Sequence, residues 1–387
     1  IGDFAFQPRY QGAGSSMVNP FEVESMEKMI HQYDLCVVGM SRGYLRNGNA
    51  DAALEKEALE LAAKAEVVLY CFGLEEISES EGLDRGHMRI PQNQINLLGE
   101  LVKVNPNLVG VLSAGSSVEM PWQHCLKAIL HGYLGGQASA GAVLDILTGI
   151  INPSGRLAET YPLRYEDTPT FRYFPASERT SEYREGLFVG YRYYDTSIVR
   201  FQYPFGYGLS YTTFETKVLA TELKENKKIV IETEVTNTGD TYSGKEVVEL
   251  YATCPAGKLE KEYRRLVAFA KTGLLAPGQC EKLTLEIGLD KLTSYSEKEA
   301  AWILEKGTYV IWAGNSLEAS APCAVLNLDK EVVLTKTQNI CPLKEELEEM
   351  KQSSEKMNQK LEALLKTAEE KKVPVMELKA ADVETRV

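Results

Sequence analysis

Short apolar runs alternate with helical patterns over the first 160 residues of the chain. The apolar runs lie at 35–39, 67–71, 108–112 and 128–131. The segments with helical spacing lie at 53–65, 92–104 and 137–148. Runs that are apolar at every position are typical of strands with both faces buried, as in a parallel sheet. We therefore expect an α/β sandwich domain at 1–160, with a mostly parallel sheet between layers of helices.

The pattern changes after residue 160. Aromatic residues and glycine are dense at 161–216, notably at 188–194 and 205–211, which we interpret as extended segments of an ordered connection. Flexible linkers lack so many aromatic side chains, because these bury large apolar areas. Apolar and polar residues then alternate in runs bounded by turn signals, at 229–235, 246–251, 282–287 and 307–312. This period of two predicts an all-β sandwich of immunoglobulin size at 217–332.

The last segment, at 333–387, has a third pattern. Apolar residues with three- and four-residue spacing run from Leu343 to Ala368, which predicts an amphipathic C-terminal helix. Its short length and Ser354 at an apolar position favour a helix packed on its own protein over a dimerising coiled coil. An oligomer of identical chains stays open as a second interpretation.

Charge narrows the choice of partners. The 387 residues carry a formal net charge of −13, with a sequence pI of about 5.1. An acidic chain repels phosphate backbones and anionic lipids, so we expect neither nucleic acid nor a membrane as partner. No run approaches the roughly 18 apolar residues of a membrane span. The start at Ile1 reads as the end of a buried strand, which we interpret as the mark of a fragment or a processed piece.

The cysteines and histidines do not predict a metal site. The seven cysteines form an odd set without a C-x-x-C pair, at positions 36, 71, 125, 254, 280, 323 and 341. This argues against a disulfide framework and a zinc site, and reduced thiols favour a cytoplasmic location. The four histidines also lack metal-binding spacing, at positions 31, 87, 124 and 131. We expect no bound metal.

The loop that follows the run 67–71 is the first candidate for chemistry. It crowds Glu79, Glu81 and Asp84 beside Arg85. In open α/β sheets, functional groups gather on loops at the carboxyl ends of strands. Crowded carboxylates near an arginine can keep one carboxyl protonated and another ionised, as acid/base catalysis requires. A solvated acidic loop is the alternative interpretation of the same residues.

Two other segments have simpler explanations than catalysis. The loop at 9–16 lacks the third glycine of a dinucleotide fingerprint and the lysine of a P-loop, so close backbone packing near a ligand explains it better than nucleotide binding. Ser116 lacks the flanking glycines of a nucleophile elbow, so we interpret it as a helix N-cap.

A series of motifs resembles the carboxyl-terminal domains of family 3 glycoside hydrolases, the β-glucosidase group. The matching segments, in order, are 10–16 (YQGAGSS), 81–85 (EGLDR) with Ile90, Pro91 and Gln94, 135–137 (GGQ), 152–157 (NPSGRL), 188–193 (FVGYRY), 204–212 (PFGYGLSYT), 235–239 (VTNTG) and 275–278 (LAPG). The resemblance implies that the β-sandwich is fibronectin type III-like. It also implies hydrolysis of terminal β-linked sugars in an oligosaccharide or aryl glycoside. No cofactor is needed for this reaction, because carboxylates do all the bond chemistry.

The resemblance assigns roles to the loop residues. In the family, the Glu of the E-G-x-D-R loop is the general acid/base, which carries over onto Glu81. Its pKa should then be raised, so that it protonates the departing oxygen and later activates water. Asp84 and Arg85 match the same motif and would either bind substrate or fix the loop through a charge-assisted pair. Glu79 is the main competitor for the acid/base role.

The resemblance also implies a further domain that this sequence does not contain. The family's nucleophile is an Asp on a separate (β/α)8 barrel, and nothing here reads as eight βα repeats. Retaining hydrolysis needs two carboxyl groups about 5–5.5 Å apart, so we expect the chain alone to be inactive. In permuted relatives the barrel follows, and 333–387 would then be its lead-in; the usual order places the barrel upstream.

Two functions of other classes stay open as alternatives. One is a non-catalytic carbohydrate-binding or scaffold module. The other is an interaction protein that dimerises through 343–368.

Overall fold

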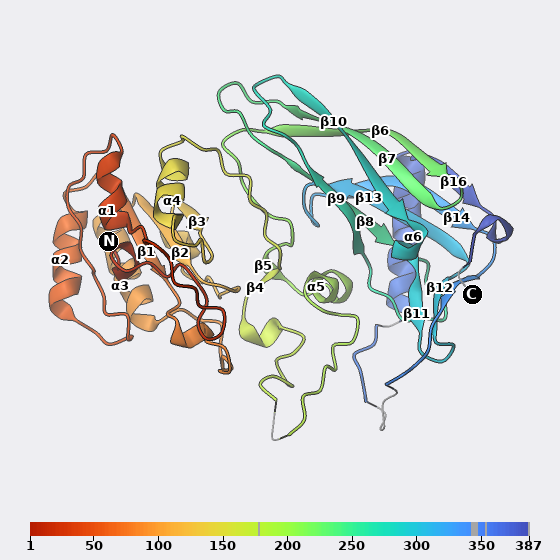
Figure 1. Cartoon of the computed structure of the whole chain (residues 1–387), viewed down its shortest axis with the longest axis horizontal. Helices are drawn as coiled ribbons and strands as arrows, with labels where there is room; N and C mark the ends of the chain where they lie inside the picture. Colours follow the sequence, from red (N-terminus) through yellow and green to blue (C-terminus); the bar gives the residue numbers. More distant parts are fainter. Residues whose placement is uncertain (177–178, 342–346, 353, 386–387) are drawn as a thin grey trace. The chain divides into compact units, whose positions relative to one another are not determined.

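The computed structural model describes residues 1–176, 179–341, 347–352 and 354–385 (Figure 1). The chain forms two compact units, Ile1–Ile151 with Tyr161–Thr168 and Asn152–Thr160 with Pro169–Val387. Each unit is described by itself. The four domain ranges expected from the sequence stay a prediction, because compactness alone does not test them.

The first unit is built on a parallel sheet. Its strands are β1 (Val68–Gly73), β2 (Leu108–Ser113) and β3 (Ala128–His131), in the order β1-β2-β3. Its helices are α1 (Met26–Met29), α2 (Ala52–Ala62), α3 (Gln92–Val104) and α4 (Ser139–Leu147), and β4 (Tyr161–Pro162) also belongs to this unit. Helix α2 packs on α3 and helix α1 on α4. The expected parallel sheet with helices is confirmed.

The expected strand at 35–39 is wrong. The segment is irregular in the structure and pairs with no strand among the described residues. Between it and β1 lie Ile1 and Gly2, whose nitrogens donate to Leu69 O (2.8 Å) and Ser41 O (2.9 Å). An apolar run forms a strand only where a neighbouring strand satisfies its backbone N–H and C=O groups. Here, among the described residues, only Ile1 and Gly2 reach the position of a neighbouring strand.

The second unit contains a β-sandwich of mainly antiparallel strands. One sheet has the order β10-β7-β6 and the other β16-β14-β13-β8-β9. Their bounds are β6 (Phe214–Lys224), β7 (Lys228–Asn237), β8 (Val247–Thr253), β9 (Arg265–Lys271), β10 (Cys280–Gly288), β13 (Gly307–Gly314), β14 (Ala321–Leu328) and β16 (Val375–Leu378). A small sheet joins β11 (Ser294–Ser296), β12 (Ala301–Leu304) and β15 (Val332–Lys336), and β5 (Phe201–Tyr203) also lies in this unit. Buried residues such as Ile231, Leu250 and Ile311 form the core. The expected β-sandwich is confirmed.

We expected the aromatic run at 188–194 to be extended, but only part of it is. Helix α5 (Tyr191–Ser197) starts within it. The ring of Tyr191 packs against Phe205 and Tyr251, and its hydroxyl accepts a hydrogen bond from the Leu266 N–H at 2.7 Å. These distant contacts override the strand preference of aromatic residues.

The C-terminal helix exists but begins later than expected. Helix α6 (Ser354–Glu370) buries Met357, Leu361 and Leu364 in a cluster that includes Val310 of β13 and Val325 of β14 (Figure 1). Residues 342–346 of the expected helix lie outside the described residues, and 347–352 are irregular. Strand β16 follows α6 and pairs in parallel with β14. The helix therefore packs on its own protein. Within the described ranges, no helix combines the length and apolarity needed to cross a membrane.

Candidate active-site loop

The loop between β1 and α3 carries the carboxylates singled out in the sequence. Strand β1 ends at Gly73, and its last residue is held by Gln94 at the start of α3, whose amide side chain both donates to Gly73 O and accepts from Gly73 N. This anchors the point where the loop leaves the sheet. Glu79, Glu81, Asp84 and Arg85 follow it, on the loop at the carboxyl end of β1, as expected.

Glu81 is exposed and is positioned by a second loop. The Ser15 N–H donates to Glu81 Oε2 at 2.5 Å, and the Glu81 N–H donates to Ala13 O at 3.4 Å. An isolated β-bridge joins Ala13 to Ser80. Hydrogen bonds from Ser15 lower the pKa of Glu81. The raised pKa that we expected is therefore not found in this chain, because the carboxylate is in solvent and accepts an N–H bond.

Gly14 is required by the close approach of the two loops. Its φ is +87°, and a Cβ added there would come within 2.6 Å of Glu81 Cβ and 2.7 Å of Glu81 Oε2. Both facts exclude larger residues without a shift of Glu81. The glycine-containing loop therefore serves close backbone packing, as expected, and its packing partner is the Glu81 loop.

Glu79 lies in a buried network. Its side chain is 9% exposed and pairs with Arg9, whose side chain is 1% exposed. It also accepts hydrogen bonds from Gly115 N (2.8 Å) and Ser116 Oγ (2.5 Å). Burial raises the pKa of Glu79, but the bonds from Ser116 and Gly115 together with Arg9 outweigh it, so that the pKa is lowered. Glu79 is thus held ionised and fully engaged.

Ser116 and Arg85 belong to the same network. Arg85 Nη1 donates to Ser116 Oγ at 2.7 Å and lies 3.5 Å from Glu79 Oε1. The interpretation of Ser116 as a helix N-cap is wrong, because no helix starts there and its hydroxyl serves Glu79 instead. Arg85 thus forms a charge-assisted pair with Glu79. Asp84 is exposed and makes no hydrogen bond or ion pair with another described residue.

A neutral histidine adjoins this network. His131, at the end of β3, stacks on Tyr133 with ring centroids 3.8 Å apart, and its Nε2 is hydrogen-bonded to the Tyr161 hydroxyl. Burial lowers the pKa of His131 to about 4, although the Leu112 carbonyl and Glu79 oppose this. The imidazole is therefore neutral near pH 7 and supports the loops as a polar but uncharged group.

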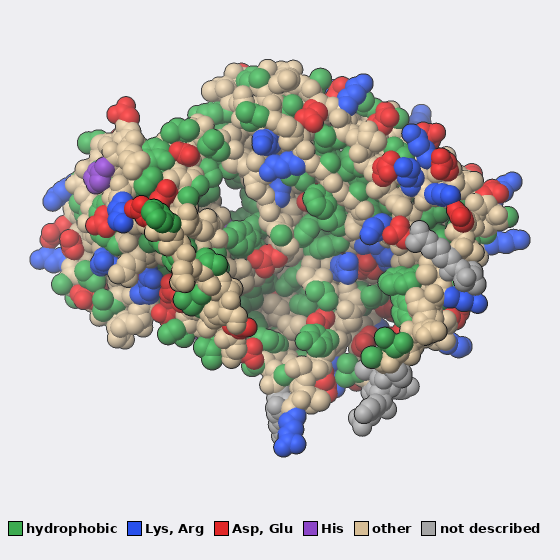
Figure 2. Space-filling model, in the orientation of Figure 1, with side chains coloured by type: hydrophobic (Ala, Val, Ile, Leu, Met, Phe, Trp, Pro, Cys, Tyr) green, Lys and Arg blue, Asp and Glu red, His purple; other side chains and the backbone are tan. Residues whose placement is uncertain are grey.

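Sequence reasoning missed the residues that bind Glu79 and so make it differ from Glu81. Arg9 lies next to the recognised 10–16 motif but 70 positions from Glu79, so that no local spacing pairs them. No group of three or more metal-binding side chains occurs among the described residues. On the face in Figure 2, acidic and basic side chains are interspersed, without a patch of one sign. The loop thus offers two exposed carboxylates, Glu81 and Asp84, of which Glu81 is held by the neighbouring loop, whereas Glu79 is buried.

Comparison with known proteins agrees with this arrangement. Residues 1–211 match the glycosyl hydrolase family 3 C-terminal domain, and residues 246–317 match a fibronectin type III-like domain. The chain belongs to glycosyl hydrolase family 3. The expected family and fold class are thereby confirmed, with the family's α/β domain followed by a fibronectin type III-like β-sandwich and a helix near the C-terminus.

Curated and solved relatives of this family 3 chain are glycoside hydrolases. It is 39% identical over 322 residues to thermostable beta-glucosidase B of Acetivibrio thermocellus, covering 82% of this chain and 42% of the relative. It is 37% identical over 330 residues to an exo-alpha-(1->6)-L-arabinopyranosidase of Bifidobacterium breve, covering 85% and 43%. The crystal structure of a GH3 beta-glucosidase from Bifidobacterium adolescentis superposes with a TM-score of 0.80 at 37% identity, over 85% of this chain and 48% of that one. The chain thus spans less than half the length of these relatives.

Proposed function

We propose that this chain is the non-barrel part of a retaining β-glycosidase, with Glu81 as general acid/base and the nucleophile supplied by a barrel domain. Glu81 would first protonate the departing glycosidic oxygen while the nucleophile attacks the anomeric carbon. As a carboxylate it would then take a proton from the water that hydrolyses the glycosyl-enzyme bond. Two carboxyl groups complete both steps, so the proposal needs no cofactor.

The contrast between Glu81 and Glu79 carries the proposal. Both lie on the loop after β1, but Glu79 is buried and bound by Arg9, Gly115 and Ser116. An acid/base must reach substrate and change its protonation state during each cycle. Glu81 is exposed and is held by Ser15, so that it meets the first condition, whereas the burial and the bonds of Glu79 leave it meeting neither.

Exposed apolar side chains on the same two loops support a missing partner. Met17, Val18 and Phe21 follow the Gly14 turn and are 62–101% exposed, and Ile77 and Leu83 flank Glu81 with 70% and 59% exposure. Soluble proteins rarely leave apolar side chains gathered in solvent unless another surface covers them. A barrel docked on these loops would bury them and would bring its nucleophile to Glu81.

The test uses the leaving-group dependence of hydrolysis. Aryl β-glucosides with poor and good leaving groups are assayed with the chain alone, with a form extended to carry a barrel, and with Glu81→Gln in that form. The chain alone should be inactive. For the poor leaving group, Glu81→Gln should lower kcat/KM by about 10²- to 10⁴-fold, and the loss should be much smaller for the good one, which departs without protonation.

Two matched variants control the test. Glu75→Gln removes a carboxylate from the same loop and should leave both rates near those of the unmodified form. Glu79→Gln should lower stability without changing the leaving-group dependence. Activity of the chain alone, or a leaving-group effect that follows Glu79, would refute the assignment. Full activity of Glu81→Gln would favour a carbohydrate-binding or scaffold role. Because a relative carries an arabinopyranosidase name, an aryl α-L-arabinopyranoside is the second substrate to assay.

A further inference from the structure

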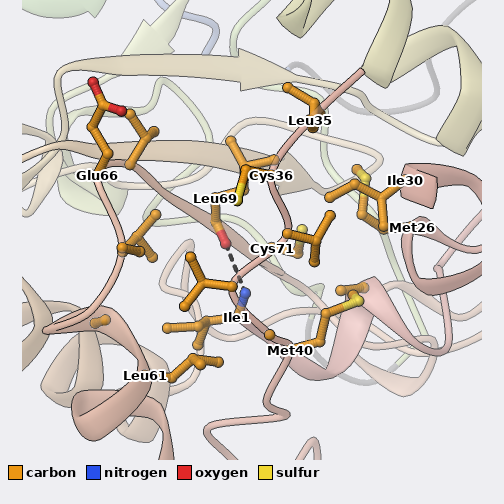
Figure 3. Close-up of a pocket in the computed structure, with 18 of the residues that line it drawn as sticks. Ile1, Met26, Ile30, Leu35, Cys36, Met40, Leu61, Glu66, Leu69 and Cys71 are labelled. Atoms are coloured by element: carbon orange, nitrogen blue, oxygen red, sulfur yellow. Dashed lines mark hydrogen bonds between the residues drawn. The ribbon is translucent and has the colours of Figure 1, made fainter. Parts of the chain in front are cut away.

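An exposed turn at 45–49 lies just before helix α2. The chain ahead of it, at 35–40, lines an apolar pocket of the first unit (Figure 3), whereas Asn47, Gly48 and Asn49 are exposed. Gly48 has a φ of +83°, and a Cβ added to it would meet no atom within 4 Å. Asn47 and Gly48 form the only Asn-Gly pair of the sequence. Because glycine has no side chain, its nitrogen is the backbone nitrogen that most easily approaches a neighbouring side chain.

The side chain of Asn47 is folded towards the backbone that follows it. Asn49 N donates to Asn47 Oδ1 at 3.0 Å, which keeps the side-chain carbonyl beside the Gly48 peptide and draws electrons from Asn47 Cγ. Gly48 N donates to Leu45 O at 3.2 Å, at the long end of the normal range. Asn47 Nδ2 makes no hydrogen bond with another described residue. An electrophilic carbon, a nitrogen nucleophile and a free amide leaving group therefore meet in one exposed turn.

Asn315 has the opposite surroundings, although a small residue also follows it. Its Nδ2 donates to Glu246 Oε2 at 3.1 Å, so that the amide is bound. The next residue, Ser316, is only 7% exposed, which keeps water from its backbone. The structure thus distinguishes Asn47 from an asparagine whose sequence context is similar.

The turn at 45–49 also anchors the start of helix α3. Asn93 Nδ2 donates to Leu45 O at 2.7 Å and to Asn49 O at 3.0 Å. The next residue, Gln94, binds both backbone groups of Gly73, where the loop that carries the candidate carboxylates begins. Because Asn93 bridges the two ends of the turn, a change in the length of the turn backbone would break at least one of its bonds.

We propose that Asn47 is a site of spontaneous modification, and that its conversion to isoaspartate loosens the anchor of α3. Gly48 N gives up its proton and attacks Asn47 Cγ. The new C–N bond closes a succinimide ring, and the Cγ–Nδ2 bond breaks to release ammonia, which takes up the proton. Water then opens the ring at Cγ, which leaves aspartate, or at the backbone carbonyl carbon, which leaves isoaspartate. In isoaspartate the main chain runs through the side chain and is one carbon longer, and both products carry a new carboxylate.

The first experiment follows the reaction itself. The chain is incubated in neutral and in mildly alkaline buffer, and mass spectrometry of its peptides measures the conversion of each asparagine to an acid. A synthetic peptide with the sequence of 44–51 is the unfolded reference. Asn47 should react within about tenfold of the rate in that peptide, and faster in the alkaline buffer, where more of the nitrogen is deprotonated. Asn315 should stay intact over the same time.

Three variants test the chemistry. Gly48→Ala places a methyl group beside the nucleophile and should slow the reaction by about tenfold or more. Asn47→Gln has a side chain too long to close the same ring and should abolish it. Asn49→Gln changes a side chain of the same turn and should leave the rate unchanged. An Asn47 that stays intact while the peptide reacts, or an equal rate in Gly48→Ala, would overturn the proposal.

The second experiment measures the effect on α3. Chromatography separates the isoaspartate form, and amide hydrogen exchange is measured at Gly73 and Gln94. The isoaspartate form should exchange about threefold or more faster at both amides. Asn93→Ala removes the same side-chain bonds and should reproduce this increase, whereas Asn47→Asp adds the charge without lengthening the chain and should keep the parent rate. Unchanged exchange in the isoaspartate form, or an equal increase in Asn47→Asp, would overturn the link to α3.

Discussion

The buried ion pair between Arg9 and Glu79 gives a prediction whose magnitude can be worked out from the structure. Arg9→Met removes the guanidinium and keeps a side chain of similar length. Arg9 is 1% exposed and binds both Glu79 and the Leu74 carbonyl, the latter at 3.1 Å. The variant would leave Glu79 buried without its closest cation. We expect the first unit to lose stability while the sandwich keeps its own.

The magnitude follows from what Glu79 keeps. Removal of one partner of a buried pair costs about 3–5 kcal/mol, because the other charge stays uncompensated. Glu79 retains its bonds from Gly115 and Ser116 and has Arg85 at 3.5 Å, so we place the cost at the lower end of that range. The lost bond to Leu74 O adds about 1 kcal/mol. The expected loss near pH 7 is about 3–4 kcal/mol.

The loss should depend on pH. The folded-state pKa of Glu79 is lowered, so its contribution to stability is present above the unfolded pKa near 4.5 and is lost as pH falls through the folded pKa. Without Arg9, burial raises the pKa of this carboxyl relative to the parent protein, and the variant protonates Glu79 at a higher pH. The difference between variant and parent should therefore be full near pH 7 and shrink towards about pH 4.

Urea unfolding followed by tryptophan fluorescence measures this loss. Trp122 belongs to the first unit and is 3% exposed. Trp302→Phe and Trp312→Phe leave it as the single reporter of the three tryptophans. Arg89→Met, on the exposed part of the loop, is the matched control and should change stability by less than about 0.5 kcal/mol. A loss below about 1 kcal/mol for Arg9→Met, or an equal loss at both pH values, would refute the reasoning.

Three further changes test the sandwich, the C-terminal helix and the loop contact. Glu305→Gln leaves Lys261 buried without its carboxylate, and both side chains are 4% exposed, so urea unfolding of the second unit should show a loss of about 3 kcal/mol. Leu364→Ala opens a cavity beneath α6 and should cost about 2–5 kcal/mol in the same assay. Gly14→Ala should displace Glu81 and lower kcat in the barrel-bearing form, measured with an aryl β-glucoside that has a poor leaving group.

Each of these changes has a control variant. Glu331→Gln breaks a partly exposed pair and should cost less than about 1 kcal/mol. Glu362→Ala changes the solvent face of α6 and should be nearly neutral. Gly86→Ala has no atom within 4 Å of the new Cβ and should leave kcat unchanged. If a control variant had as large an effect as the variant that it accompanies, burial and contact would not explain the effect.

Elements that depend on local pattern could be predicted from the sequence. The runs that became β1 and β2 are apolar throughout, and most of their residues are buried. Helix α2 begins where Asp51 accepts hydrogen bonds from the Ala53 and Leu54 nitrogens, a signal contained within four residues. In the sandwich, β7 and β10 alternate because one face of each meets the core.

Elements that depend on distant partners could not be predicted in the same way. The run at 35–39 has the composition of a strand, but strand formation is decided by a neighbour in space. Helix α5 forms where Tyr191 meets Phe205 and Tyr251, and nothing within 188–194 encodes those contacts. Helix α6 begins at Ser354, and shortly before it Gln352 N donates to Glu260 Oε1, 92 positions away.

In the candidate site, too, some features follow from local sequence and others depend on distant residues. The position of the loop after β1 follows from sheet topology, so the sequence could predict that its carboxylates gather there. Which carboxylate is accessible depends on Arg9 and Ser116, 70 and 37 positions from Glu79. Neither residue carries a local sign of that role. For this reason the sequence alone could not show that Glu79 is buried and Glu81 exposed.

The pKa of Glu81 links the loop to the proposed partner. A general acid must carry a proton near neutral pH, yet the Ser15 N–H and solvent favour the ionised form of Glu81 in this chain. Burial of the carboxyl or a second carboxylate nearby would reverse this shift. In the proposed enzyme a docked barrel supplies both, since it covers the exposed loops and places its nucleophile about 5–5.5 Å from Glu81. Docking of the barrel would then provide both the nucleophile and the proton that the acid lacks. The chain without a barrel should therefore fail at the first step of catalysis, because it has neither a nucleophile nor a protonated acid.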